Sequence, residues 1–326
     1  MARIIVKTAV GLEGIAIEEV KSILAVNAKK LIDGRIIFES SDADKLIKNT
    51  RSSELAYSLL KQFKFKTLAD IISSISGIDF SFIKKDFVVK CSRDGKHDFN
   101  SVDVAKRVGE FIFNKGHKVN MDSNEVIYVD IIHDACIIGI LLKDRLGKRS
   151  YRVKINNQSI SPLVAFALLK LSDFKASESI LDPFCRDGVI LIEAALFGGK
   201  KLYGIDNENN VRNARINAAM AKSKIAFYPA SEKENLKQKI DKIITCLPLV
   251  SANNKNAESL LANFFKETCK KAKVSITCLA REAKFAETLA KKHGFHVLKK
   301  IAVVTGGQLQ TILVILPKRV KMPKKA

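Results

Sequence analysis

The sequence lacks tryptophan and contains little proline or cysteine, and its few cysteines follow no metal-binding pattern. In 326 residues there are six prolines, six cysteines and no tryptophan. No CxxC pair and no Cys/His pair of ligand spacing occurs, so we expect no zinc site and no other metal. Scattered cysteines also argue against a disulfide framework and favour a reducing, cytoplasmic location. The cysteines are Cys91, Cys136, Cys185, Cys246, Cys269 and Cys278.

Long apolar runs are absent as well. No stretch approaches the roughly 20 apolar residues that a bilayer-spanning helix needs, and the first residues lack the apolar run of a signal peptide. A Walker phosphate loop and a Ser/His/Asp nucleophile set are also missing. We therefore expect a soluble, intracellular protein without a membrane partner, long enough for two or three domains.

The balance of charge is strongly basic. The chain has 56 Lys and Arg against 34 Asp and Glu, a formal net charge of +22, of which residues 151–326 hold +17. A surplus of this size favours polyanionic partners, because neutralising phosphates releases condensed counterions. Charge alone fits RNA, DNA or an anionic membrane equally, and a basic surface that only keeps the protein soluble is the alternative.

The first 145 residues predict two small α+β modules, 1–65 and 66–145. Runs of β-branched residues predict strands, and apolar residues at helical spacing predict helices. In the first module we expect strands at 4–6 and 35–39 and helices at 15–24 and from Asp42. In the second we expect strands at 87–91, 126–132 and 135–142 and a helix from about Asp103 to Ile112.

From residue 155 to 318, strands and helices alternate, which is typical of a parallel, doubly wound sheet. We expect strands at 179–181, 201–205, 242–245 and 274–279, and helices at 162–171, 189–196, 209–221, 257–272 and 282–293. The pair Gly306-Gly307 between two apolar runs, 297–304 and 310–316, predicts an antiparallel hairpin at the end of this domain. The remaining residues, 319–326, form a basic tail that we expect to fray.

Polar residues follow three of the predicted strands, in the segments 182–188 and 246–249 and at Asp206. Ligands of open parallel sheets bind outside the carboxyl ends of the strands, where the strand order reverses. Asp206 lies 24 residues after Asp182, a spacing at which an acidic side chain can bind ribose hydroxyls. Gly188 opens a helix, where backbone N–H groups can face a ligand. A capped turn that binds no ligand is the alternative.

Several segments match one family in chain order. They are Thr8-Ala9-Val10-Gly11-Leu12-Glu13, Arg93-x-Gly95-x-His97-x-Phe99-x-Ser101-x-Asp103, Lys148-Arg149-Ser150-Tyr151-Arg152 with Ser161-Pro162, Asp182-Pro183-Phe184-Cys185-x-x-Gly188 with Ile192-Glu193-Ala194-Ala195, and Gly204-Ile205-Asp206 with Asn217-Ala218. Together they resemble the THUMP-domain-containing RNA (tRNA guanine-N2) methyltransferases, nearly end to end. The resemblance implies a ferredoxin-like module, a THUMP RNA-binding domain and a Rossmann-like class I methyltransferase domain.

The resemblance also implies a reaction, a cofactor and a set of site residues. A member of this family methylates the exocyclic N2 of a guanine, using S-adenosyl-L-methionine, with tRNA as the expected RNA partner. The implied cofactor-binding residues are Ser161, Asp182, Phe184, Cys185, Gly188, Asp206 and Asn207. The implied RNA-binding residues are Arg93, Lys96, His97, Arg149 and Arg152, although local loop hydrogen bonds are the alternative role for Arg93 and His97.

Two segments depart from the family pattern. Where the family has Gly-Ser, this chain has Arg186-Asp187, and an arginine there either turns away from the ligand or fills part of its space. The residues that match the catalytic motif are Cys246, Pro248 and Leu249. In the family, an Asn or Asp oxygen at the first position accepts a hydrogen bond from the target amine, and an aromatic ring at the last stacks on the flipped base. Cysteine and leucine supply neither.

Three hypotheses about function remain from the sequence. The first is an RNA methyltransferase, and the second is a catalytically degenerate member that binds tRNA or acts as a partner protein. The third, a methyltransferase of DNA or protein, conflicts with the THUMP-like half. A nucleophilic role for Cys246 is a weaker idea, since a strand-end thiol is more often buried and inert. The acid expected near the adenine is not evident, and Ser231 or Glu232 stands in its place.

Overall fold

The computed structural model describes residues 1–238, 240–249 and 255–318, and it divides into two compact units. The first unit comprises Met1–Thr8 and Ala16–Leu146, and the second comprises Ala9–Ile15 and Gly147–Ala326. The predicted tail, 319–326, lies outside the described residues. Within those residues, no helix has both the length and the apolar character that crossing a membrane requires.

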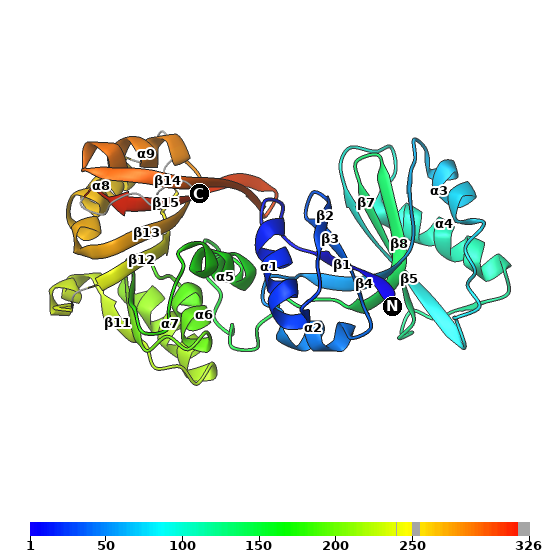
Figure 1. Ribbon diagram of the computed structural model, residues 1–326, viewed down its shortest axis with the longest axis horizontal. Coiled ribbons are helices and arrows are strands. Elements are labelled where there is room, and N and C mark those ends of the chain that lie inside the picture. The colour runs from blue at the N-terminus through cyan, green and yellow to red at the C-terminus, as the bar shows by residue number, and fades with distance from the viewer. Residues whose placement is uncertain (239, 250–254, 319–326) are drawn as a thin grey trace. The chain divides into compact units, whose positions relative to one another are not determined.

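The first unit is built on one eight-stranded sheet (Figure 1). The strand order is β2-β3-β1-β4-β8-β7-β5-β6, antiparallel except where β5 pairs with β6 and β7. Its elements are β1 (Ala2–Lys7), α1 (Glu13–Leu24), β2 (Lys29–Ile32), β3 (Arg35–Ser40), α2 (Ala43–Asn49), β4 (Leu55–Lys64), α3 (Leu68–Ile75), β5 (Asp86–Asp94), α4 (Ser101–Asn114), β6 (Lys118–Val119), β7 (Val126–Ile132) and β8 (Ala135–Lys143). Since β4 pairs with both β1 and β8, the sheet continues across residue 65, and the division there stays a prediction.

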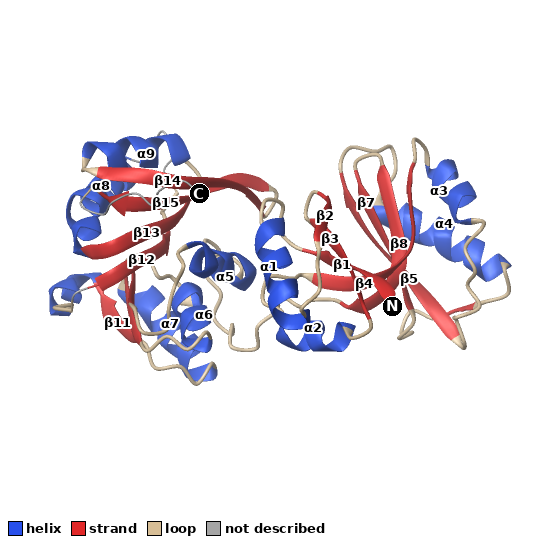
Figure 2. Cartoon of the chain, in the orientation of Figure 1, coloured by secondary structure: helices blue, strands red, loops and turns tan. Residues whose placement is uncertain are grey.

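Helices α3 and α4 cover one face of this sheet (Figure 2). Each begins with a capping box, Thr67 with Asp70 for α3 and Asn100 with Asp103 for α4, which satisfies backbone N–H groups of the first turn. Apolar residues four apart then form one buried stripe on each helix. The stripes are Ile71 and Ile75 on α3, and Val104, Val108 and Ile112 on α4.

A buried ion pair joins β3 to β7 inside the first unit. The Arg35 guanidinium donates to both carboxylate oxygens of Asp130, at 2.8 and 2.7 Å. Tyr57 and Ser92 donate to the same carboxylate, at 3.0 and 2.7 Å. Burial by itself raises the pKa of Asp130, but the hydrogen bonds and charge of Arg35 outweigh it, so the pKa lies below its ordinary value.

The second unit has a seven-stranded sheet of order β11-β10-β9-β12-β13-β15-β14. The elements are α5 (Pro162–Leu171), β9 (Ser179–Asp182), α6 (Val189–Leu196), β10 (Lys201–Asp206), α7 (Glu208–Met220), β11 (Ala226–Pro229), a 3-10 turn (Ala230–Asn235), β12 (Ile240–Cys246), α8 (Lys255–Asn263), a π turn (Phe264–Thr268), a 3-10 turn (Cys269–Lys271), β13 (Ala272–Ala280), α9 (Ala283–Lys292), β14 (Phe295–Thr305) and β15 (Gln308–Pro317). The strands from β11 to β13 are parallel.

Helices cover both faces of this sheet, as expected for a doubly wound fold (Figure 1). Apolar residues of α5, α6 and α7 form one buried cluster, and those of α8 and α9 form another on the opposite face. The predicted terminal hairpin is confirmed, since β14 and β15 pair antiparallel around Gly306-Gly307. Strand β15 lies between β13 and β14.

The Arg35–Asp130 pair yields a test of the first unit. We expect Arg35→Met to lower local stability by about 3–5 kcal/mol, because it leaves a buried carboxylate without its counter-charge. Lys64→Met is the control, since it breaks the fully exposed pair with Asp134 and should leave stability nearly unchanged. Hydrogen exchange of β1 and β7 amides in the full chain measures both variants, and equal protection in the two would contradict the expectation.

Candidate functional site

The strand order of the second sheet reverses beside β9. From β9 the chain moves outward through β10 to β11, then returns to the other side of β9 with β12 and continues to β13. The loops that follow β9, β10 and β12 therefore meet at one edge of the sheet, where ligands of such folds bind. We call residues 182–188, 206–207 and 246–249 the strand-end site.

Asp182, the last residue of β9, is buried inside the strand-end site. Its Oδ1 accepts hydrogen bonds from the Thr245 hydroxyl at 2.6 Å and the Phe184 backbone N–H at 3.2 Å. Only 1% of the side chain surface is exposed. Burial raises the pKa of Asp182 from 3.8 to about 7, although these two hydrogen bonds and nearby Arg186 act in the opposite direction. Asp182 therefore holds the β9 loop and titrates near neutral pH.

Asp206, the last residue of β10, connects the β9 loop to the start of α7. Its Oδ2 accepts from the Arg186 backbone N–H at 2.8 Å. Its Oδ1 accepts from the backbone N–H of Asn207 at 2.8 Å and from the Asn210 side chain at 2.7 Å. The residue is half-buried. The structure thus brings the two predicted acids, Asp182 and Asp206, to the same edge of the sheet.

Arg186 crosses from the β9 loop to the end of β12. Its guanidinium donates to the carbonyl oxygens of Cys246 at 2.9 Å and Leu247 at 3.3 Å. Its backbone is left-handed, with φ of +47°, and the residue is 7% exposed. Of the two orientations open from the sequence, the side chain takes the one that fills space inside the strand-end site.

Asp187 points to a different partner, the segment 147–161 that precedes α5, which we call the connector. Its carboxylate pairs with Arg152 at 2.9 Å and also accepts from the Ser159 hydroxyl. Similarly, Arg149 and the Tyr151 hydroxyl donate to Glu193 of α6, at 2.9 and 2.8 Å. Both carboxylates are fully buried. The guanidiniums predicted to bind RNA therefore hold the connector in place, and their contact with RNA stays a prediction.

The glycine at position 188 suits a left-handed backbone conformation and a tightly packed position. Its φ is +80°, and a Cβ there would lie 3.1 Å from the Ala214 Cβ and 3.2 Å from the Phe227 ring. Gly188 thus allows the start of α6 to pack closely against Ala214 of α7 and Phe227 of β11. This role is structural, and it differs from the predicted approach of backbone to a ligand, which stays a prediction.

The other predicted cofactor residues have identifiable local roles. Ser161 caps α5 by accepting from the Val164 N–H at 3.3 Å, and Asn207 caps α7 by accepting from the Asn210 N–H at 2.9 Å. The Phe184 ring packs 5.5 Å from Phe264. Cys185 is buried, and its N–H donates to the Ile205 carbonyl at 3.1 Å.

The residues at the catalytic-motif positions differ in exposure. Cys246 is 8% exposed, Pro248 is half-buried, and Leu249 is 42% exposed. Burial raises the pKa of the Cys246 thiol, and the adjacent Arg186 charge only partly opposes this. A protonated, buried thiol is neither a good hydrogen-bond acceptor nor a reactive nucleophile.

In the first unit, the predicted RNA-binding residues lie at the end of β5 (Arg93) and on the turn after it (Lys96 and His97). Arg93 donates to the Gly95 carbonyl at 2.9 Å and lies 3.0 Å from His97 Nδ1. The His97 ring stacks on both Phe65 and Phe99, with centroids 5.6 and 5.1 Å away, and the two phenylalanine rings also lie 6.0 Å from each other. Arg93 and His97 therefore make local contacts within the loop, as the alternative to RNA binding predicts. Lys96, by contrast, is exposed.

The sequence did not reveal the residues that join the connector to helices α6 and α7. Asn217 of α7 accepts from the backbone N–H groups of Val153 and Lys154, at 3.1 and 2.9 Å, and donates to the Asp187 carbonyl at 2.9 Å. Asn217 stood within a matched motif, and so did Glu193. A buried polar residue on an otherwise apolar helix face was the available signal.

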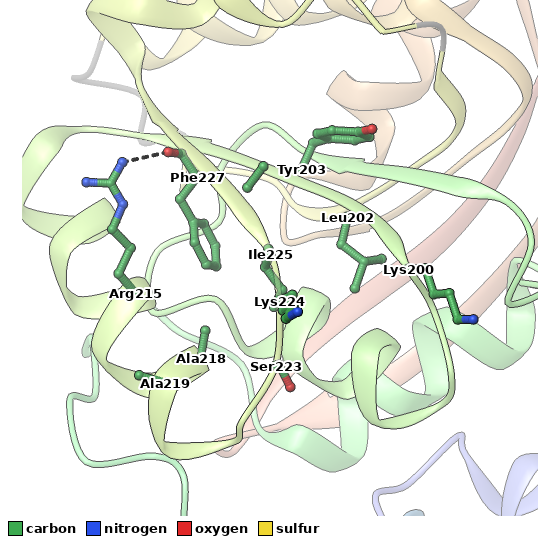
Figure 3. A pocket seen from close by; sticks show the side chains of 11 residues that line it. Lys200, Leu202, Tyr203, Arg215, Ala218, Ala219, Ser223, Lys224, Ile225 and Phe227 are labelled. Atoms are coloured by element: carbon green, nitrogen blue, oxygen red, sulfur yellow. Dashed lines mark hydrogen bonds between the residues drawn. The ribbon is translucent and has the colours of Figure 1, made fainter.

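A surface pocket of about 520 Å³ lies between α7 and the amino ends of β10 and β11 (Figure 3). It is lined by apolar Leu202 and Phe227 and by exposed Lys200, Arg215 and Lys224. This is the opposite edge of the sheet from the strand-end site, so the pocket does not contribute to that site. Within the described residues, no three His, Cys, Asp or Glu side chains group as metal ligands would.

Comparison with protein families gives the domain arrangement a name. Residues 149–311, half of the chain, match the model described as RMKL-like, methyltransferase domain. The chain belongs to this family. Residues 65–141 match the THUMP domain model. This confirms the resemblance seen in the sequence, and the strand-end site lies inside the RMKL-like domain.

Individual relatives agree with the family. A tRNA (guanine(6)-N2)-methyltransferase of Archaeoglobus fulgidus is 34% identical over 57% of this chain and 51% of its own length, so the chain spans about half of that relative. The crystal structure of TrmN from Thermus thermophilus has a TM-score of 0.79 at 22% identity, covering 97% of this chain and 100% of TrmN. A putative methyltransferase, SMU.472, complexed with SAH, has a TM-score of 0.80 at 17% identity, covering 98% of this chain and 99% of its own. The predicted fold is confirmed.

The raised pKa of Asp182 predicts a pH-dependent stability. The folded state favours the protonated carboxyl of Asp182. The stability that protonation contributes is therefore fully present below the pKa of the unfolded chain, 3.8, and is lost as the pH rises through the pKa of the folded chain, about 7. Asp182→Asn removes this titration. Its stability relative to the native chain should rise by about 3 kcal/mol between pH 5 and pH 8 in urea denaturation. A constant difference across this range would contradict the raised pKa.

All six thiols should be unreactive in the folded chain. Burial raises the pKa of each thiol above its ordinary value, and it raises the pKa of the half-buried Cys91 to about 12. At pH 8 we expect alkylation at least about 100-fold slower than in urea, where all six react. Mass spectrometry of alkylated peptides identifies each site, and one rapidly modified thiol at Cys246 would restore the nucleophile idea.

Proposed function

We propose that this protein is an S-adenosyl-L-methionine-dependent RNA methyltransferase that acts on the N2 of a guanine in tRNA. The proposal rests on the convergence of Asp182 and Asp206 at the strand-order reversal of an RMKL-like domain, in a chain that also has a THUMP domain. The name of the Archaeoglobus relative supports the choice of tRNA and of guanine N2. The basic surplus of +22 supports a polyanionic substrate.

The residues of the strand-end site fit this cofactor at its nucleoside end. Asp206 is a half-buried acid at a strand end, and an acid in that place can accept hydrogen bonds from ribose hydroxyls. Helix α6 begins directly after its N-cap, Gly188, and its first N–H groups favour a partner with negative charge. When bound, the cofactor supplies an electrophilic methyl group. The side chain of Arg186 fills part of the site by reaching the carbonyls of Cys246 and Leu247.

The base side of the site is less complete. A thiol at position 246 is a weak acceptor for the amine, and Leu249 offers an apolar surface in place of an aromatic ring. The main-chain carbonyls of Cys246 and Leu247 are the stronger acceptors there, and both are bonded to Arg186. This observation favours the second candidate function, a tRNA-binding or partner protein without methyl transfer.

RNA contact is proposed for the first unit, with Lys96 as its exposed cation near the turn after β5. Arg93 and His97 would shape that turn through their mutual contact. We place the activity in the cytoplasm, because six unpaired thiols are best preserved in a reducing compartment.

Methyl transfer from labelled S-adenosyl-L-methionine to tRNA from cells lacking the protein tests the proposal. Asp206→Ala should reduce transfer at least about 100-fold, since hydrogen bonds to a charged acceptor would be lost, and it should leave tRNA affinity within about twofold. Glu208→Ala, which removes an exposed carboxylate two residues away, is the control and should transfer normally. tRNA binding without transfer by the native chain would favour the second candidate.

A further inference from the structure

Arg186 lies where a ligand of this fold would be expected. It starts on the loop after β9 and ends on the carbonyls of β12, and these two strands flank the reversal of strand order. Sites of open parallel sheets are formed outside the carboxyl ends of such a pair. The Arg186 side chain spans these two strand ends, so a group of the protein itself lies where a ligand would bind.

Three attachments hold Arg186 in that position. Its backbone N–H donates to Asp206, and its guanidinium donates to the carbonyls of Cys246 and Leu247. The residue thus links the ends of β9, β10 and β12, and it is 7% exposed. Any ligand that enters between β9 and β12 must displace the guanidinium, and it must compete with hydrogen bonds that are already formed.

The acceptors of the Arg186 guanidinium carry no charge, so it can exchange them for water. Arg149 and Arg152 each pair with a buried carboxylate, whereas the acceptors of Arg186 at β12 are neutral carbonyl oxygens. A hydrogen bond from a charged donor to a neutral acceptor is weaker than one within an ion pair. A guanidinium that moves from a buried position into water also regains its hydration. The side chain can therefore leave without breaking an ion pair.

We propose that Arg186 is an internal latch that closes the strand-end site, and that cofactor binding requires this side chain to move out. The inference rests on the proposed function, because the ligand excluded is the S-adenosyl cofactor. Opening has a second consequence, since it also releases the carbonyl oxygens of Cys246 and Leu247. These are the strong acceptors left at the β12 end for the amine of a target base. One side chain thus controls both the cofactor side and the base side.

Arg186→Gly opens the latch without straining the backbone. A φ of +47° suits glycine better than arginine, so the variant is expected to fold. Arg145→Gly is the matched control, because Arg145 has φ of +52°, is exposed and lies outside the strand-end site. Both variants relieve the same conformation and remove the same charge, and only one of them opens the site.

Calorimetric titration of the full chain with S-adenosyl-L-homocysteine gives the deciding measurement. Arg186→Gly should bind at least about tenfold more tightly than the native chain, while Arg145→Gly should match the native chain. Hydrogen exchange without ligand should also accelerate at residues 182–188 and 246–249 in Arg186→Gly alone.

Other outcomes overturn the latch in distinguishable ways. Equal binding by native chain and Arg186→Gly would refute the latch and leave the proposed function standing. Weaker binding by Arg186→Gly would make Arg186 a direct ligand contact, which also refutes it. Absence of binding by every variant up to millimolar concentrations would overturn both the latch and the S-adenosyl-dependent function.

Discussion

The reversal of strand order beside β9 is the constraint on which the rest of the second unit depends. Parallel strands cannot be joined by tight turns, so each strand from β9 to β13 is separated from the next by a longer crossover. The loops after β9, β10 and β12 are thereby gathered at one edge of the sheet. The hydrogen bonds of Asp182 with Thr245 and of Asp206 with Arg186 each connect two of these strand ends.

Two adjacent residues on the β9 loop, Arg186 and Asp187, contact different parts of the domain. Because Arg186 is left-handed, its side chain reaches β12, while the next side chain, Asp187, reaches Arg152 on the connector. Buried polar contacts thus fix two adjacent residues of the loop in different directions. Such contacts contribute modestly to net stability, but leaving one of these groups unpaired would be costly. They therefore specify a single conformation of the loop.

Much of this arrangement could be predicted from the sequence, because it follows from periodic patterns. Apolar runs separated by helical stretches gave the strands of the second sheet, and the order of motifs brought Asp182 and Asp206 together. The four-residue strand β11 (Ala226–Pro229) was missed, since it is too short to form a pattern. Strand β4 and helix α3 were missed too, although the capping box at Thr67 was visible in the sequence.

Long-range ionic partners have no comparable signal. Arg149 and Arg152 were assigned to RNA by resemblance, and their carboxylate partners, Glu193 and Asp187, lie 44 and 35 residues away in the chain. Spacing says nothing about which cation meets which acid across a fold. The direction of the Arg186 side chain was equally undetermined, because it depends on a positive φ that the sequence does not reveal.

The two departures from the family pattern prove to be in contact. Arg186 replaces a glycine on the β9 loop, and Cys246 replaces an oxygen acceptor at the end of β12, yet the Arg186 guanidinium donates to the Cys246 carbonyl. Any residue at position 246 would present this main-chain carbonyl, so the contact depends on the arginine and not on the cysteine side chain. The closed state of the proposed latch is therefore stabilised by the backbone of β12, through the carbonyls of Cys246 and Leu247. In the open state the same carbonyls would be free to accept a hydrogen bond from a substrate.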